Sequence, residues 1–405
     1  MSRAPDDHSR TERSGRDPAR ELSLECPSVK DRNVHGDWFD TLERMGESFL
    51  IRLGRYRRGM SQPDWFFLPH QHFDGLGGFA HLLRTTQSTE LAIPELATTE
   101  RPSALARWMA ALRLLCRRPV RPRPWRLTDA ASNASTRKRT PTGSSGSAAG
   151  EGSRANLTCA HATAEPAFAW TLFSAADTLA LRASARSRDV SLNALLLWGL
   201  AETCLEHLAG REDAAEREGA AWIVPVNMRG AVPGERDTAN LASILDVAFP
   251  LPARPSTVDA ALRKERSKLA HFGAWQLLQM LGHLPRWVRQ ALVRHEANVP
   301  KHGSFSNLGQ LGPRGRTDPD VVAVANMGEW WMVFNPVIRS RPVGMACLTW
   351  QGRMAVTLQL HPVLNQSERE ACDWLSTWRN LVLPPSHVAP AAGQESSPCD
   401  DDGAA

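Results

Sequence analysis

Residues 128–156 contain no large apolar side chain, and this stretch limits the possible folds more than any other part of the sequence. Its Ser, Gly, Ala and charged residues bury too little apolar surface to offset the entropy lost on ordering. We therefore expect a flexible linker over 128–165. It divides the chain into an N-terminal lobe, 31–127, and a C-terminal lobe, 166–383.

The rest of the composition is typical of a globular protein with polar ends. Hydrophobic residues make up 42% of the chain, enough for a sizeable core, and the polar residues 1–30 and 384–405 are expected to be disordered. No signal-like apolar stretch occurs in the first twenty residues, and the seven scattered cysteines form no CxxC pair. The longest apolar run, 194–201, is far below the roughly 20 residues that span a bilayer. We expect a cytoplasmic protein with at most peripheral membrane contact.

The net charge of +5 is carried largely by arginines at 113–126 and by the basic residues 136–139. Neither stretch belongs to a recognisable nucleic-acid module, so we expect no nucleic-acid partner. One interpretation is that the arginine run binds the phosphates of a ligand or binds an acidic protein domain. The other is that it is a solvated linker. The amphipathic, basic segment 275–295 either packs on the protein surface or touches a membrane.

Hydrophobic periodicity and capping residues predict a mixture of strands and helices. Strands are expected at 47–56, 63–73, 167–173, 220–228, 321–327, 328–336, 343–350 and 353–361. Helices are expected at 79–86, 102–118, 174–188, 191–210, 256–272, 274–294 and 366–382. Segment 191–210 is apolar around most of its circumference and is expected to be a buried core helix. This pattern predicts an α/β (α+β mixed) fold with an extensive sheet.

The segment "PHQHFDGLGG", 69–78, carries the strongest candidate for chemistry. On a strand, His70, His72 and Asp74 would share one face and could bind zinc. The segment resembles the HxHxDHxGG signature of metallo-β-lactamase-type hydrolases, except that Gly75 stands where a second-metal histidine should be. The remaining motifs of that family are missing, so zinc hydrolysis is a lesser alternative and we expect no metal.

Read as HxxxDG, the same segment resembles the HHxxxDG motif of the CoA-dependent acyltransferase superfamily, which includes chloramphenicol acetyltransferase-like enzymes, condensation domains and wax ester synthases. Four later segments resemble family motifs in the family's order. They are "SLNALLLWGLAETCLEHL" (191–208), "VPVNMRG" (224–230), "ANLASILDVAFP" (239–250) and "SFSNLGQLGP" (304–313). The resemblance covers about residues 50–383. It implies two chloramphenicol acetyltransferase-like lobes with mixed sheets and an active site between them.

The resemblance also implies roles for particular residues. His70 would be the general base that removes the acceptor's proton, and a neutral imidazole suits that task. Asp74 would turn away from the substrate and pair with Arg229 as a structural strut. Gly75, Ser306 and Asn307 are candidates for the substrate and oxyanion site. The glycines after Asp74 would permit a tight turn.

The expected reaction moves an acyl group from a CoA or acyl-carrier-protein thioester to a hydroxyl or amine of a small-molecule or lipid acceptor. The thioester would be a co-substrate, and no permanently bound cofactor is expected. Three departures leave a catalytically degenerate, condensation-like binding protein open. Pro69 replaces the first histidine of the motif, Ala194 replaces the acidic residue that usually follows the helix asparagine, and the N-terminal lobe is shorter than in larger relatives. The sequence discloses neither the acceptor nor the acyl chain length.

Overall fold

The computed structural model describes residues 36–45, 50–57, 60, 62–95, 102–116, 166–208, 219–232, 238–313, 329–364 and 367–383. The segments expected to be disordered, 1–30, 128–165 and 384–405, lie outside the described residues, as does the expected strand 321–327.

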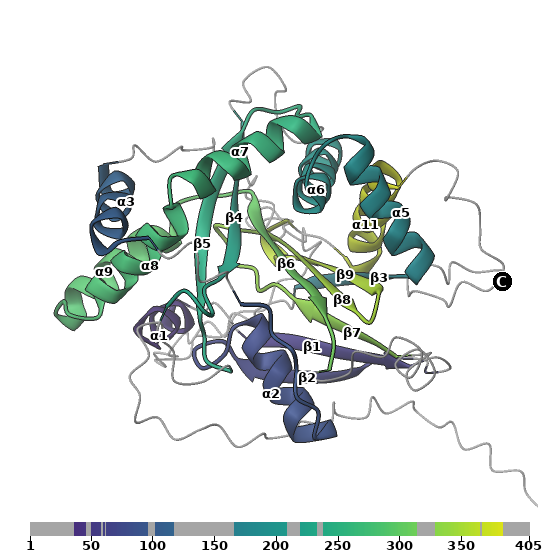
Figure 1. The fold of residues 1–405 in the computed structure, drawn as a ribbon, viewed down its shortest axis with the longest axis horizontal. Helices are drawn as coiled ribbons and strands as arrows, with labels where there is room; N and C mark the ends of the chain where they lie inside the picture. The colour runs from purple at the N-terminus through teal and green to yellow at the C-terminus, as the bar shows by residue number, and fades with distance from the viewer. Residues whose placement is uncertain are drawn as a thin grey trace, which may run out of the picture.

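Two sheets form the framework of the molecule (Figure 1). The smaller sheet has the order β2-β1-β7 and is antiparallel throughout. Its strands are β1 (Leu50–Arg57), β2 (Asp64–Pro69) and β7 (Glu329–Phe334). The larger sheet has the order β3-β9-β8-β6-β4-β5. Its strands are β3 (Ala167–Phe173), β4 (Ala220–Asn227), β5 (Ala242–Phe249), β6 (Gly303–Leu311), β8 (Val343–Trp350) and β9 (Arg353–Leu360). Strand β6 runs parallel to both its neighbours and the other pairs are antiparallel, which confirms the mixed α/β class.

The two sheets meet where β7 lies against β8 and β9. Every residue of β7 and of β8 is buried, as expected of strands covered on both faces. The Thr357 hydroxyl of β9 donates to the Val333 carbonyl of β7 at 2.6 Å, so a side chain joins the sheets directly. Strand β7 belongs to the expected C-terminal lobe, 166–383, yet it pairs with β1 of the N-terminal lobe. The domain boundaries stay a prediction, and the smaller sheet draws strands from both ranges.

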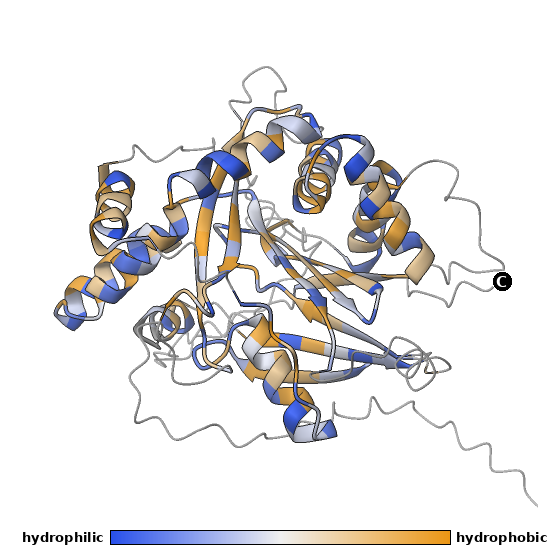
Figure 2. Cartoon of the chain, in the orientation of Figure 1, coloured by the Kyte–Doolittle hydropathy of each residue, from blue (hydrophilic) through white to orange (hydrophobic). Residues whose placement is uncertain are grey.

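Helices surround the two sheets (Figure 2). They are α1 (Gly36–Arg44), α2 (Gly75–Gln87), α3 (Ala104–Cys116), α5 (Ala175–Ser187), α6 (Leu192–Leu208), α7 (Pro255–Ser267), α8 (Ala270–Leu281), α9 (Arg286–Ala297) and α11 (Glu368–Val382), with a short 3-10 helix η4 (Pro362–Leu364). Helix α6 is the expected core helix, since most of its residues are buried. Its Gly199 lets it approach α11 closely, because an added Cβ would lie 2.5 Å from Val382.

Sequence signals place several helix boundaries correctly. Ser174 and Asp177 form the predicted capping box at the start of α5, and Ser103 accepts from the Ala106 amide at the start of α3. The expected helix 274–294 is wrong, because the chain forms two helices on either side of Pro285. Proline disfavours the helical conformation in the residue before it, which explains the break.

Candidate functional site

The candidate site begins at the turn that follows β2. The strand was expected to continue to Phe73, but it ends at Pro69, and the His72 amide donates to the Pro69 carbonyl at 3.1 Å to close a turn. That expectation was therefore wrong. His70 lies in this turn, at the end of a strand whose register with β1 is fixed up to Pro69.

Helix α2 begins at Gly75, four residues before the expected Phe79. Asp74 caps the helix: its Oδ1 accepts from the Gly77 amide at 2.7 Å. Aspartate at this position satisfies an otherwise unpaired amide of the first turn and favours helix initiation. The glycines expected to form a tight turn are thus helical.

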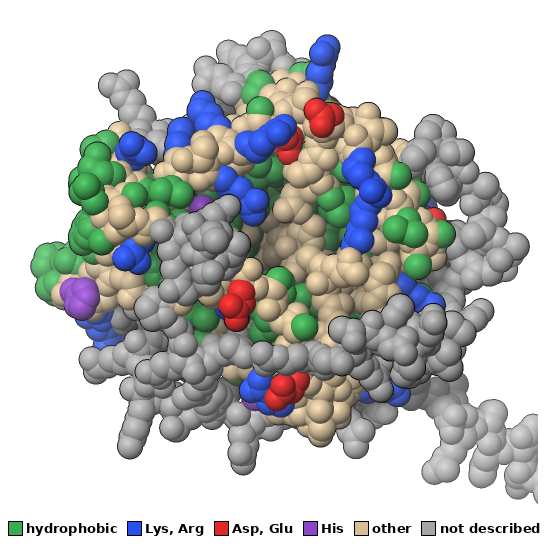
Figure 3. Space-filling model, in the orientation of Figure 1, with side chains coloured by type: hydrophobic (Ala, Val, Ile, Leu, Met, Phe, Trp, Pro, Cys, Tyr) green, Lys and Arg blue, Asp and Glu red, His purple; other side chains and the backbone are tan. Residues whose placement is uncertain are grey.

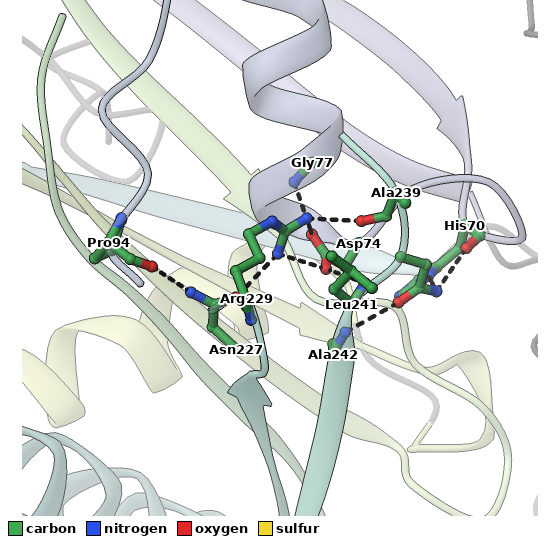
Figure 4. Close-up of polar contacts among 10 residues, drawn as sticks. His70, Asp74, Gly77, Pro94, Asn227, Arg229, Ala239, Leu241 and Ala242 are labelled. Carbon is green, nitrogen blue, oxygen red and sulfur yellow. Dashed lines mark hydrogen bonds and ion pairs between the residues drawn. The ribbon is translucent and has the colours of Figure 1, made fainter. Parts of the chain in front are cut away.

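The other side of Asp74 faces Arg229. Arg229 donates through Nη1 to Asp74 Oδ2 at 2.9 Å and through Nη2 to Asp74 Oδ1 at 3.0 Å, which is a bidentate ion pair (Figure 4). Both residues are only 4% exposed. The Leu241 amide also donates to Oδ2, at 2.8 Å. The pair therefore connects the start of α2 to the chain between β4 and β5, and Arg229 is not an exposed loop residue.

Arg229 is held by two further acceptors. Its Nη2 donates to the Ala239 carbonyl at 2.6 Å, and its Nη1 donates to Asn227 Oδ1 at 3.1 Å. Asn227 in turn donates to the Pro94 carbonyl at 2.6 Å. A buried charge is tolerated when it is paired and hydrogen-bonded, and both Nη groups of Arg229 have acceptors in this network.

His70 lies beside this network and is contacted by Asn240 (Figure 4). Its ring stacks on Phe39 with 4.7 Å between ring centroids, and Asn240 donates to the His70 carbonyl at 3.1 Å. Burial lowers the pKa of His70 below its ordinary value of 6.5. Ring hydrogen bonds to the carbonyls of His70 and Phe73 and the charge of Asp74 oppose that lowering of the pKa without cancelling it. The imidazole is therefore neutral at pH 7.

A cavity of about 570 Å³ lies on the Asn227 side of the network. Figure 3 shows the hollow near the centre of this face, with Lys and Arg side chains at its edge. Its polar lining residues are Glu95, Arg186, Asp189, Ser191, Asn193, Asn227, Asp259, Arg263, Arg266 and Asn307. His70 is not among the lining residues. Hydrogen bonds from Asn227 through Arg229 to Asp74 connect the cavity wall to the turn that carries His70.

The oxyanion candidates lie at different places. Asn307 of β6 lines the cavity, where its Nδ2 donates to Asn193 Oδ1 at 2.7 Å and its Oδ1 accepts from the Gly309 amide. Ser306 is half-buried on the same strand and does not line the cavity. Gly75 faces β6, because an added Cβ would lie 3.5 Å from Leu308. The oxyanion role of these residues stays a prediction.

The turn does not fit a zinc site. His70, His72 and Asp74 could share one face only on a strand, and the strand ends before them. Both oxygens of Asp74 are occupied by Arg229 and by backbone amides. Within the described ranges, no three His, Cys, Asp or Glu side chains form a metal-sized group.

Three residues of this network had no role assigned from the sequence. Asn240 lies in "ANLASILDVAFP", which carried the resemblance, and its motif position was a usable signal. Asn227 precedes Arg229 by two residues, and its side chain bonds both the amide and the guanidinium of Arg229. Phe39 lies on α1, far from the motif in sequence, so no local pattern indicated its contact with His70.

Gly77→Ala is expected to destabilise the protein by about 1–3 kcal/mol, the usual effect of overpacking. An added Cβ would lie 2.2 Å from the Thr238 carbonyl oxygen and 2.9 Å from Arg229 Nη2, so the backbone or the ion pair must shift. Urea unfolding measures this loss. Gly75→Ala is the matched control in the same helical turn, because its nearest neighbour would be 3.5 Å away. Equal stability of the two variants would contradict the close approach at Gly77.

No protein family model and no curated protein matches this chain. Solved structures are similar at low identity. The epimerization domain from the third module of tyrocidine synthetase B is 13% identical, with a TM-score of 0.38 over 78% of this chain and 67% of that one. Polyketide synthase associated protein 5 from Mycobacterium tuberculosis is 14% identical, with a TM-score of 0.39 over 80% of this chain and 74% of that one.

The wax ester synthase/diacylglycerol acyltransferase from Marinobacter aquaeolei VT8 is 11% identical, with a TM-score of 0.34 over 53% of this chain. The chain spans 48% of that enzyme's length. Other structural neighbours are two condensation domains and a trichothecene 15-O-acetyltransferase.

Proposed function

We propose that this chain transfers an acyl group from a CoA or carrier-protein thioester to a hydroxyl or amine acceptor, with His70 as general base. The observation that supports this most strongly is the bidentate contact between Asp74 and Arg229, two residues 155 positions apart. The motif resemblance implies that contact.

In the proposed reaction, the neutral His70 imidazole takes the proton of the acceptor O–H or N–H as that atom attacks the thioester carbonyl. A carbon–oxygen or carbon–nitrogen bond forms, and the carbonyl oxygen becomes an oxyanion. Collapse of this intermediate breaks the carbon–sulfur bond, and the leaving thiolate receives the proton from the imidazolium. The ion pair does no proton transfer. It holds the turn that aims His70, so Asp74 and Arg229 are positioning residues.

The existence of the activity is tested by thiol release from a panel of acyl-CoA thioesters with short, medium and long chains. Each thioester is supplied with and without a mixture of alcohol and amine acceptors. We expect release to increase when a suitable acceptor is present, with the acylated acceptor found by mass spectrometry. Thiol release without an acceptor would indicate hydrolysis. A lack of thiol release with every donor, even when acceptors are present, would count against the transferase.

The pH dependence of the reaction should follow the titration of His70. Because burial lowers the pKa of His70, its neutral form persists below pH 6.5, and kcat/KM should fall only as the pH drops through that lowered pKa. The measurement is kcat/KM for thiol release as a function of pH. His72→Ala is the matched control and should keep the same acid limb, although the pKa of His72 is also lowered by burial. An acid limb with its midpoint above 6.5 would contradict the assignment.

A binding role without catalysis is the second candidate. It is favoured by one observation: the cavity is lined by three arginines and three acidic residues, but His70 does not line it. A binding protein would retain an acyl thioester without releasing thiol. Equilibrium binding of a non-hydrolysable thioether analogue, combined with the thiol assay, separates this candidate from the transferase.

A further inference from the structure

Helices α3, α8 and α9 expose a group of large apolar side chains, here called the apolar patch. The patch consists of Leu105, Trp108, Met109, Leu112, Leu115, Met280, Leu284, Trp287 and Leu292. Two of them protrude strongly: Leu105 is 72% exposed and Trp287 is 74% exposed. Isolated exposed leucines are common on proteins, but a group of this size indicates an interaction surface. Figure 3 shows these side chains gathered along one edge of the molecule, over α3 and the α8–α9 segment.

The fold turns this patch outward. Helix α3 packs its small residues Ala110 and Ala111 against α8 at Gly273, where an added Cβ would lie 2.7 Å from the Ala110 backbone. The large side chains of α3 therefore lie on its opposite, exposed face. Helix α9 is held from its other side by α1, through Leu42 and the buried Val293. The patch is thus presented by helices that are anchored by their inner faces.

The helices that carry the patch are basic. Segments 102–126 and 270–295 contain no aspartate or glutamate. The basic residues on the helices are Arg107, Arg113, Arg286, Arg289 and Arg294. The first acidic residue of α9 is Glu296, which pairs with Arg341. An apolar centre among arginines requires an occupant that is apolar and anionic.

We propose that the apolar patch binds the surface of a bilayer that contains anionic phospholipids. Tryptophan and leucine side chains insert at the boundary between headgroups and acyl chains, while arginines contact the lipid phosphates. A second copy of this chain fits poorly, because it would bring the arginines of these helices against the same arginines, and like charges repel. No helix within the described residues is long and apolar enough to cross a membrane. This inference does not depend on the proposed function.

The test is co-sedimentation of the full chain with vesicles made of equal parts phosphatidylcholine and phosphatidylglycerol, compared with phosphatidylcholine alone. We expect binding to the anionic vesicles that weakens with salt. Leu105→Glu and Trp287→Glu, on separate helices, should each lower the partition coefficient roughly tenfold or more, because each inserts a charge where an apolar group entered the bilayer. Circular dichroism and thermal melting establish that the variants are folded.

Leu179→Glu is the matched control, since Leu179 on α5 is 58% exposed but lies outside the patch. It should bind vesicles as the wild type does. Four results would overturn the proposal: no binding to anionic vesicles, equal binding to neutral ones, unchanged binding of both patch variants, or an equal loss in the control. A dimer of the wild type that Leu105→Glu dissociates would assign the patch to self-association instead. Loss of thiol release with intact vesicle binding would affect only the proposed function.

Discussion

Replacing Arg229 with leucine is expected to lower the free energy of unfolding by about 3–5 kcal/mol. The substitution leaves the Asp74 carboxylate buried, with two backbone amides but no countercharge. Coulomb attraction is strong in a medium of low polarity, and the charge cannot move to water without breaking the start of α2. Urea or guanidinium unfolding, followed by circular dichroism, measures the loss.

Asp64→Asn provides the control for this prediction. Asp64 pairs with Arg55 at 2.8 Å, but its side chain is 44% exposed, so solvent screens the pair. We expect a loss of no more than about 1 kcal/mol, as is usual for exposed ion pairs. The double variant Asp74→Asn with Arg229→Leu should be more stable than the sum of the two single losses implies, because the first change removes the stranded charge. An Arg229→Leu variant as stable as Asp64→Asn would show that the buried pair does not hold the fold.

Four strands of the larger sheet, β3, β4, β8 and β9, could be predicted, whereas β5 and β6 were not expected as strands. Segments 167–173 and 343–350 correspond to β3 and β8 without a shift at either end. Both are runs rich in aliphatic and aromatic residues between turn residues, and burial on both faces leaves little competition from other structures. The capping box at Ser174 is likewise a local signal, because residues three apart satisfy each other's backbone groups.

The start of helix α2 was not predicted, because the side chain of Asp74 has two roles. Asp74 belongs to a motif that was interpreted through its pairing with Arg229, and its second role as the cap of α2 was overlooked. That cap shifts the start of the helix from Phe79 to Gly75. Pro285 within the expected helix 274–294 was a usable signal for two helices, but the amphipathic pattern on both sides obscured it.

Contacts between distant segments were only partly predictable. The pairing of Asp74 with Arg229 was expected because of motif order, not because of local chemistry. No comparable signal indicated that β7 joins β1, that α3 packs on α8, or that Phe39 stacks on His70. Such contacts depend on the shapes of the packed helices and strands and on which of their faces are still unpaired. Periodicity along the chain does not specify which elements pack together.

His70→Ala is expected to lower kcat/KM for acyl transfer by roughly 10²–10⁴, the range that a positioned general base contributes. Without the imidazole, the acceptor keeps its proton during attack and is a weak nucleophile at neutral pH. The fold should remain intact, because the Asp74–Arg229 pair is untouched. His72→Ala removes a neighbouring imidazole in the same turn and should leave the rate unchanged.

Thiol release by wild type, His70→Ala and His72→Ala, with the same donor and acceptor and at matched folded fractions, is the most direct measurement of the role of His70. We predict a decrease of roughly 10²–10⁴ for His70→Ala alone. Equal rates in the wild type and His70→Ala would contradict general-base catalysis by this histidine.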